Sequence, residues 1–304
     1  MKLSKGQGVV LVVITACIWA FGPIFVRYFS AFLDVHTQNA FRYLSASVSL
    51  LIISLIFFRK ELKQCLKIWP KLLITSFFIV IMQTFWTLSL YRILPATATL
   101  IGKISIVFTV VMSFMFFHEE RESIKSIKYI SGTLLCFFGV IGVIFLKKEM
   151  TSLQMKLGII FVVLAELFWT LYAVYVQKKL KSYNTLAFMP YVLIISFFVF
   201  SVLAMIKGNP MAIIYLPPKA LFFLFISGLF CIGIAHSIYY FAIRATGIAL
   251  ASSVLLVSPF LTAIFSYFIF GEILTVGQLI SGAIILIGGY IVSKSKGIKH
   301  HQRS

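Results

Sequence analysis

Residues 9–29 read VVLVVITACIWAFGPIFVRYF, a run that holds a single charged residue, Arg27. An apolar run of roughly 20 residues is long enough to cross the hydrocarbon core of a bilayer as a helix. A helix is favoured there because it satisfies its own backbone hydrogen bonds. The run is too long for the apolar region of a signal peptide, and no small-residue cleavage site follows it. We therefore predict a membrane-spanning helix here.

The same pattern continues along the chain. Of the 304 residues, 61% are hydrophobic and only 12% are charged, whereas an ordinary globular chain has roughly 25% charged residues. Because a soluble fold could not bury so much apolar surface, we predict an all-α integral membrane protein. The same length criterion gives ten transmembrane helices, near residues 9–29, 38–58, 71–91, 95–117, 129–146, 157–177, 186–206, 219–243, 247–270 and 277–293.

The basic residues predict the orientation of these helices. Lysine and arginine outnumber aspartate and glutamate by 27 to 8, but they occur in short clusters between apolar runs, which argues against a nucleic-acid partner. Most of them fall in loops on one side of the bilayer if the N-terminus is cytoplasmic, and cytoplasmic loops are enriched in such residues. We therefore expect a multi-pass cell-membrane protein of the bacterial inner-membrane type, with both termini cytoplasmic.

Several segments of the first half recur in the second half. They share their order and a nearly constant separation of 150 to 152 residues, which is typical of a duplicated fold. The pairs are Ile18-Trp19-Ala20-Phe21 with Phe168-Trp169-Thr170-Leu171, Tyr91-Arg92-Ile93-Leu94-Pro95 with Ile243-Arg244-Ala245-Thr246-Gly247, Phe117-His118-Glu119-Glu120 with Phe270-Gly271-Glu272, and Ser131-Gly132 and Gly139 with Ser281-Gly282 and Gly289.

The duplication predicts two five-helix repeats, residues 1–150 and residues 151–304, the second with a short basic C-terminal tail. Because five is an odd number, the second repeat enters the membrane from the opposite side. The halves are then inverted repeats related by an axis in the membrane plane. Such a scaffold has similar inside-facing and outside-facing conformations, as alternating access requires.

These features together resemble the drug/metabolite transporter superfamily, EamA type. The resemblance rests on the ten spans, the tryptophans of the first and sixth spans, the Gly-Glu ending of the ninth span and the Ser-Gly segments of the fifth and tenth. It implies secondary transport, often export, of amino acids or related metabolites. It also implies a central cavity lined by helices one, three, six and eight, with four and nine nearby. The first copy departs from the pattern, because it ends His118-Glu119-Glu120.

Two ionisable residues fall in the middle of spans, Glu166 and Lys103. A charge at the bilayer centre costs about 2.5–3.5 kcal/mol on insertion scales, so each is a candidate functional residue. Arg42 lies about one turn from the end of its span, and we expect it to reach the interface instead. The repeat counterparts of Glu166 and Lys103 are Ala16 and Leu255, so the symmetry of the scaffold requires neither charge.

Three interpretations of this pair remain open. Glu166 and Lys103 could form a buried ion pair that joins two helices. They could instead face an aqueous cavity and complement the ammonium and carboxylate of a zwitterionic substrate. Leu164-Ala165-Glu166 also resembles the segment that carries the proton-coupling carboxylate of the small multidrug resistance family. A protonated Glu166 without a transport role is the third interpretation.

Aromatic and polar residues on the same helical faces complete the candidate site. Rings around a charge pair suit an organic amine through cation–π contacts, although tryptophan and tyrosine also serve as interfacial or packing residues. His236 could equally be an interhelical hydrogen-bonding residue. The predicted substrate-binding residues are Glu166, Lys103, Trp169, Gln83, Trp86, His236, Tyr240 and Trp19, with Glu166 also the proton-coupling residue.

We therefore predict a secondary active transporter, an exporter of an amino acid or organic amine, with protons as one possible coupling ion. The alternative is a membrane protein that does not move solutes, such as a lipid-scrambling or receptor-like protein. An enzyme is not expected, because the spans lack clustered carboxylates. No cofactor and no metal site are expected, and the small-molecule substrate and the lipid bilayer are the expected partners of a monomer or homodimer.

Overall fold

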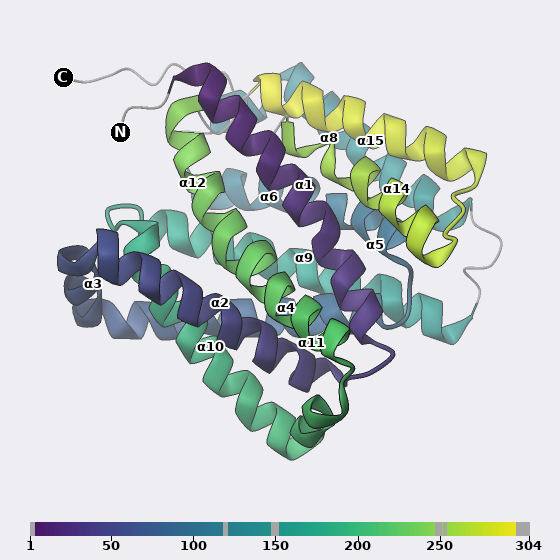
Figure 1. Ribbon diagram of the computed structural model, residues 1–304. Coiled ribbons are helices and arrows are strands. Elements are labelled where there is room, and N and C mark those ends of the chain that lie inside the picture. Colours follow the sequence, from purple (N-terminus) through teal and green to yellow (C-terminus); the bar gives the residue numbers. More distant parts are fainter. Residues whose placement is uncertain (1–3, 118–120, 147–151, 247–250, 252–253, 296–304) are drawn as a thin grey trace, which may run out of the picture.

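The computed structural model describes residues 4–117, 121–146, 152–246, 251 and 254–295. Every regular element in this part of the chain is a helix (Figure 1). Seven helices are long and apolar enough to cross a membrane, and three shorter apolar helices lie near the C-terminus. Together they correspond to the ten predicted spans, so the predicted fold class is confirmed.

The helix bounds are as follows. In the first half they are α1 (Lys5–Phe29), α2 (Val35–Phe57), α4 (Trp69–Leu90), α5 (Pro95–Ile101), α6 (Ser105–Phe116) and α8 (Ile127–Phe145). In the second half they are α9 (Leu153–Lys179), α10 (Thr185–Lys207), α11 (Pro218–Ile226), α12 (Ala235–Thr246), α14 (Ser258–Phe270) and α15 (Val276–Ser295). The shorter elements are α3 (Arg59–Cys65), η1 (Leu66–Ile68), α7 (Arg121–Ile124) and η4 (Pro210–Tyr215).

Two predicted spans are interrupted. The span predicted at 95–117 consists of α5 and α6 joined by a 3-10 turn, η2 (Gly102–Ile104). The span predicted at 219–243 contains a π-helical segment, η5 (Ser227–Ile234), between α11 and α12. Non-α backbone of this kind is tolerated at membrane depth where it is buried in protein or lines a cavity. The span predicted at 247–270 lies partly outside the described residues.

The helix contacts are symmetric between the halves. Helix α1 packs against α12, and its repeat counterpart α9 packs against α4, the counterpart of the α11–α12 span. Helices α8 and α15, which are counterparts of each other, pack together, and so do α2 and α10 (Figure 1). A twofold relation between the halves requires this pattern of contacts. It agrees with two inverted five-helix repeats.

Glycines bring α8 and α15 into close contact. A Cβ atom added at Gly288 would lie 2.6 Å from the backbone oxygen of Gly132, and one added at Gly139 would lie 2.6 Å from Cγ1 of Ile285. Small residues allow this approach, as in membrane helix pairs generally. The glycine-rich segments of the fifth and tenth spans therefore form a contact between the halves.

The turn after α14 carries a buried glutamate that joins the halves. Gly271 ends α14 with φ of 65°, a left-handed conformation that glycine adopts readily. The carboxylate of Glu272 then accepts hydrogen bonds from the backbone N–H groups of Ala96 and Thr97 at 2.8 and 2.9 Å, and from the Thr97 hydroxyl at 2.7 Å. Glu272 thus caps the N-terminus of α5 from the other repeat. Its first-half counterparts lie outside the described residues.

A second carboxylate joins the halves at a loop. Asp34 precedes α2, and its Oδ1 accepts hydrogen bonds from the backbone N–H groups of His36 and Thr37. Its Oδ2 accepts a hydrogen bond of 2.9 Å from the backbone N–H of Asn209, which follows α10. The loops after α1 and α10 are therefore tied together. The predicted orientation, with both termini cytoplasmic, would put both loops on the extracytoplasmic side.

Candidate functional site

A cavity of about 670 Å³ lies between the two halves. Ligand cavities of roughly 300–1,000 Å³ hold small organic molecules, so this one has room for a metabolite. It is bounded mainly by α1, α4, α9 and the α11–α12 span, with contributions from α2, α10, the turn between α5 and α6, and the start of α14. The superfamily resemblance implied these helices except α2 and α10, which also contribute lining residues.

The structure brings most of the predicted site residues to this cavity. Its lining includes Trp19, Gln83, Trp86, Lys103, Glu166, Trp169 and His236. The side chain of Tyr240 lies outside the described part of the structure, whereas the neighbouring Tyr239 does line the cavity. The fourth tryptophan, Trp69, is 60% exposed and is not part of the cavity lining.

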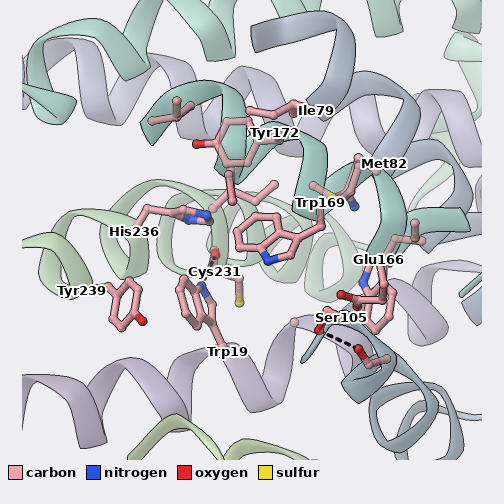
Figure 2. A pocket seen from close by; sticks show the side chains of 18 of the residues that line it. Trp19, Ile79, Met82, Ser105, Glu166, Trp169, Tyr172, Cys231, His236 and Tyr239 are labelled. Carbon is pink, nitrogen blue, oxygen red and sulfur yellow. Dashed lines mark hydrogen bonds between the residues drawn. The ribbon is translucent and has the colours of Figure 1, made fainter. Parts of the chain in front are cut away.

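The interrupted fourth span forms the surroundings of Glu166. A Cβ atom at Gly102 would lie 2.9 Å from Oε1 of Glu166, so the carboxylate of α9 lies directly against the 3-10 turn η2. Ser105, at the start of α6, lies next to this carboxylate (Figure 2). The hydroxyl of Ser105 also donates to the backbone oxygen of Gly102 at 2.9 Å. The turn thus presents a glycine and a hydroxyl to Glu166.

Lys103 belongs to the same turn and interacts electrostatically with Glu166. In the part of the chain that the structure describes, no direct ion pair within 4.0 Å joins them. Both side chains line the cavity. This geometry disfavours the interpretation of a closed ion pair between two helices, and it leaves both charged groups accessible to a ligand.

Aromatic rings form the wall contributed by α1 and α12. The Trp19 indole N–H donates to the backbone oxygen of Cys231 at 3.1 Å (Figure 2). The Trp19 ring contacts the rings of His236 and Tyr239, each at a centroid distance of 5.1 Å. Nδ1 of His236 is buried and has no hydrogen-bond partner among the described residues. The ring of His236 is therefore held by packing against Trp19 and by an interaction with the Ile232 backbone.

The opposite wall comes from α4 and α9. Trp169 contacts Tyr172 at a centroid distance of 5.5 Å, and both line the cavity. The Gln83 amide donates to the Thr87 hydroxyl at 3.3 Å and approaches Asn39 of α2 at 3.5 Å. Gln83 therefore also belongs to a polar network between helices. The two repeat-related tryptophans, Trp19 and Trp169, both line the cavity from the first helix of their halves.

The prediction that Arg42 reaches the membrane interface is wrong. Its position near the end of a span suggested that it reaches the interface, but its side chain is only 3% exposed and lines the cavity. The guanidinium Nε donates to the Ser227 hydroxyl of η5 at 3.1 Å. Packing of η5 against α2 closes the outward route that snorkelling would need.

Sequence reasoning also missed Ser105, Tyr172 and Cys231, which line the cavity. Tyr172 lies three residues after Trp169, so helical spacing could have identified it. Ser105 could not be found in this way, because the 3-10 turn changes the face that residues after Gly102 present. Cys231 contributes through its backbone oxygen, to which Trp19 donates, and the sequence carries no signal for such a contact.

Comparisons with known proteins agree with this architecture. A transporter of Haemophilus influenzae described as uncharacterized is 27% identical over 285 residues, which cover 89% of this chain and 92% of the relative. An uncharacterized transporter of Clostridium kluyveri is 28% identical over 204 residues, 64% of this chain and 62% of the relative. One crystal structure of a protein superposes with a TM-score of 0.67 over 93% of this chain and 95% of its own, at 15% identity, which shows a shared fold.

The sequence profile of the EamA-like transporter family matches the chain twice, at residues 6–145 and 156–294. Each match covers one of the five-helix halves that contribute to the cavity. The chain therefore belongs to the EamA-like transporter family, within the drug/metabolite transporter superfamily.

Proposed function

We propose that this membrane transporter exports an amino acid or a related organic amine by alternating access, with the central cavity as its binding site. The observation that carries the proposal is the arrangement of Glu166 and Lys103. Opposite charges line one cavity and interact electrostatically, yet they form no direct ion pair. In this arrangement Glu166 binds the ammonium of the substrate and Lys103 its carboxylate.

Energetics support this role for the pair. Holding a charge within the membrane is costly, and a buried charge is stabilised only when it is paired and hydrogen-bonded. A zwitterion supplies one partner for each side chain, so it relieves both costs when it binds. Because the charges are already positioned by η2 and α9, little ordering is needed upon binding.

The aromatic lining supports an amine as the ligand. Trp19, Trp86 and Trp169 line the same cavity as Glu166. The face of an indole ring attracts a cation, and this attraction strengthens when water is excluded. The remaining apolar wall provides space for the rest of the molecule. The cavity therefore suits a small amine with an apolar portion.

The extent of the cavity supports an inward-facing state and export. It reaches Lys181 and Thr185 between α9 and α10, at the end of the molecule that the loop charges assign to the cytoplasm. At the opposite end, Asp34 ties two loops together. A cavity open to the cytoplasm can load a cytoplasmic metabolite. The symmetric contacts of the halves then provide the related outward-facing arrangement.

Counterflow in proteoliposomes tests the proposal. Liposomes that contain the purified protein and unlabelled leucine should accumulate labelled leucine transiently, with panels of amines, other amino acids and nucleosides measured at two pH values. Lys103→Met should abolish counterflow of zwitterions without lowering the amount of folded protein. Lys207→Met, an exposed lysine at the end of α10, is the matched control and should behave as wild type. Exchange of nucleosides but of no amino acid or amine contradicts the proposal.

A further inference from the structure

We propose that Arg42 binds a second carboxylate of the substrate, so that the transporter favours acidic amino acids over neutral ones. This inference rests on the proposed function, because it adds a third contact to the site formed by Glu166 and Lys103. The observation behind it is a buried, incompletely bonded guanidinium in the wall of the cavity.

Arg42 has no anionic partner in the described structure. Among the described residues, its buried NH1 nitrogen has no hydrogen-bond partner, and its Nε donates to the neutral Ser227 hydroxyl. The groups that interact electrostatically with it are the thiol of Cys231 and the phenols of Tyr43 and Tyr91. No described aspartate or glutamate is among them. A buried cation that is left in this state is strongly destabilising.

The charges that line the cavity indicate what the missing partner is. Glu166 offsets Lys103 electrostatically, which leaves the positive charge of Arg42 without compensation. A neutral zwitterion would preserve that excess inside the membrane. A substrate with one ammonium and two carboxylates would pair every one of these groups. Guanidinium groups bind carboxylates through two parallel hydrogen bonds, so an anionic oxygen pair fits this position well.

The packing of η5 holds Arg42 in place. At Gly228, a Cβ atom would overlap the backbone oxygen of Arg42, so the π-helical segment lies directly on this turn of α2. The adjacent Ser227 accepts a hydrogen bond from Nε, and NH1 has no hydrogen-bond partner among the described residues. π-helical turns occur frequently at functional sites. The segment has no counterpart in α4, which is a regular helix over the equivalent residues.

Glutamate and glutamine provide a matched pair of probes, because they differ by one charge and hardly in size. Three of the four tryptophans line the cavity, so tryptophan fluorescence of the purified full-length protein reports binding. Wild type should bind glutamate roughly 30-fold more tightly than glutamine, the effect of one buried charge pair. Arg42→Gln should bind both equally. Arg42→Lys should keep a reduced preference, since it retains the charge without the fork of donors.

Arg27→Gln is the control, because Arg27 donates to the Leu90 backbone oxygen and is not part of the cavity lining. It should keep the full preference for glutamate. The inference is overturned if wild type shows no preference for glutamate, including the case in which it binds neither probe, or if Arg42→Gln keeps the preference. If Arg42→Gln does not fold, Arg42→Lys provides the test. A preference of Arg42→Lys for glutamate that equals the wild-type preference also overturns the inference.

Counterflow measurements distinguish failure of the Arg42 inference from failure of the proposed function. If leucine and glutamine undergo counterflow as well as glutamate does, the Arg42 inference fails and amino-acid transport stands. If glutamate binds through Arg42 but liposomes exchange no amino acid or amine, the proposed transport fails and the binding site stands.

Discussion

A carboxylate in the middle of a membrane-spanning helix needs neighbours that stabilise it, and Glu166 has three. Gly102 allows the turn η2 to lie against the carboxylate, Ser105 contributes a hydroxyl, and Lys103 contributes an opposite charge. All three come from one interrupted span. The Ser105 hydroxyl can hydrogen-bond to either form of the carboxyl group, whereas the positive charge of Lys103 stabilises the ionised form.

We expect Glu166→Gln to lose proton-driven accumulation. Coupling requires proton and substrate to use the same carboxylate in each facing state, and glutamine keeps the shape and hydrogen-bonding capacity but cannot titrate. Exchange of substrate across the membrane should persist. The measurement is accumulation in liposomes under an imposed pH difference alone, with Glu61→Gln, an exposed residue of α3, as the control. Uphill accumulation by Glu166→Gln would show that another group couples the proton.

Asp34 gives a pH-dependent prediction. Burial raises the pKa of Asp34, but hydrogen bonds from Thr37, Asn209 and His36 outweigh burial and hold the pKa below its ordinary value of 3.8. The folded state therefore binds the proton more weakly than the unfolded chain does. The stabilisation is complete above pH 3.8 and is lost as the pH falls through the lower folded pKa.

We expect Asp34→Asn to lower the thermal unfolding midpoint at neutral pH, with a loss of about 1 kcal/mol. Because only the charge is removed, the difference from wild type should shrink below pH 3.8. Unfolding of the detergent-solubilised protein across this pH range measures it, and Glu61→Gln should follow wild type throughout. A difference that grows as the pH falls would contradict the assigned direction.

Among the elements, the fourth span of each half is interrupted by a turn. In the first half the interruption is the 3-10 turn η2, and in the second half residues 256–257 form a turn directly before α14. Both turns adjoin the cavity, the first through Lys103 and the second through the flanking Leu255 and Ser258. The irregularity is thus a property of the repeated unit, whereas the charged residue placed on it is specific to the first half.

We expect Glu272→Ala to destabilise the protein. The substitution removes the acceptor for the first N–H groups of α5, and each buried group left unsatisfied costs about 1–3 kcal/mol. The unfolding midpoint in detergent should fall clearly, while Glu61→Ala, at an exposed helical position, should change it little. An unchanged midpoint in Glu272→Ala would mean that other groups cap α5.

We also expect Gly288→Ala to weaken the contact between α8 and α15. The new Cβ atom would lie 2.6 Å from the oxygen of Gly132 and 2.8 Å from the nitrogen of Cys136, and backbone atoms cannot move aside cheaply. Overpacking of this kind costs about 1–3 kcal/mol. Gly6→Ala is the control, because the exposed Gly6 has only Ser4 near its Cβ position, and alanine favours a helix. Equal midpoints for the two variants would contradict close packing of the halves.

In the whole molecule, the symmetric helix contacts and the charged residues without a charged repeat counterpart have different roles. Repeat-related helix pairs form the scaffold, and symmetry of this kind provides two related conformations. Glu166, Lys103 and Arg42 break the symmetry, because their counterparts carry no matching charges. The symmetric helix pairs therefore form the scaffold, and under the proposed function the asymmetric residues determine what is carried.

The orientation in the membrane is a property of the whole molecule. We expect a reporter fused after Ser304 to be cytoplasmic, because most loop lysines and arginines then face the cytoplasm. A reporter fused after Gly208, in the loop that Asp34 holds, should be extracytoplasmic. The reverse result for both fusions would invert the orientation and turn the open end of the cavity outward.

The ten spans, the duplication and the charged pair could be predicted without a structure. Hydropathy and repeat spacing are properties of neighbouring residues along the chain, so they can be read without coordinates. Glu166 and Lys103 were identifiable for the same reason, since a charge within an apolar run is exceptional.

The interruptions of the helices and the burial of individual side chains could be seen only in the folded structure. The break at Gly102, the π-helical turn at Ser227 and the burial of Arg42 depend on contacts between helices that are far apart in sequence. Arg42 shows the physical reason most directly. The free energy of a side chain near a helix end depends on whether lipid, water or protein lies beside it, and α2 acquires its neighbour η5 only when the second half of the chain packs against the first.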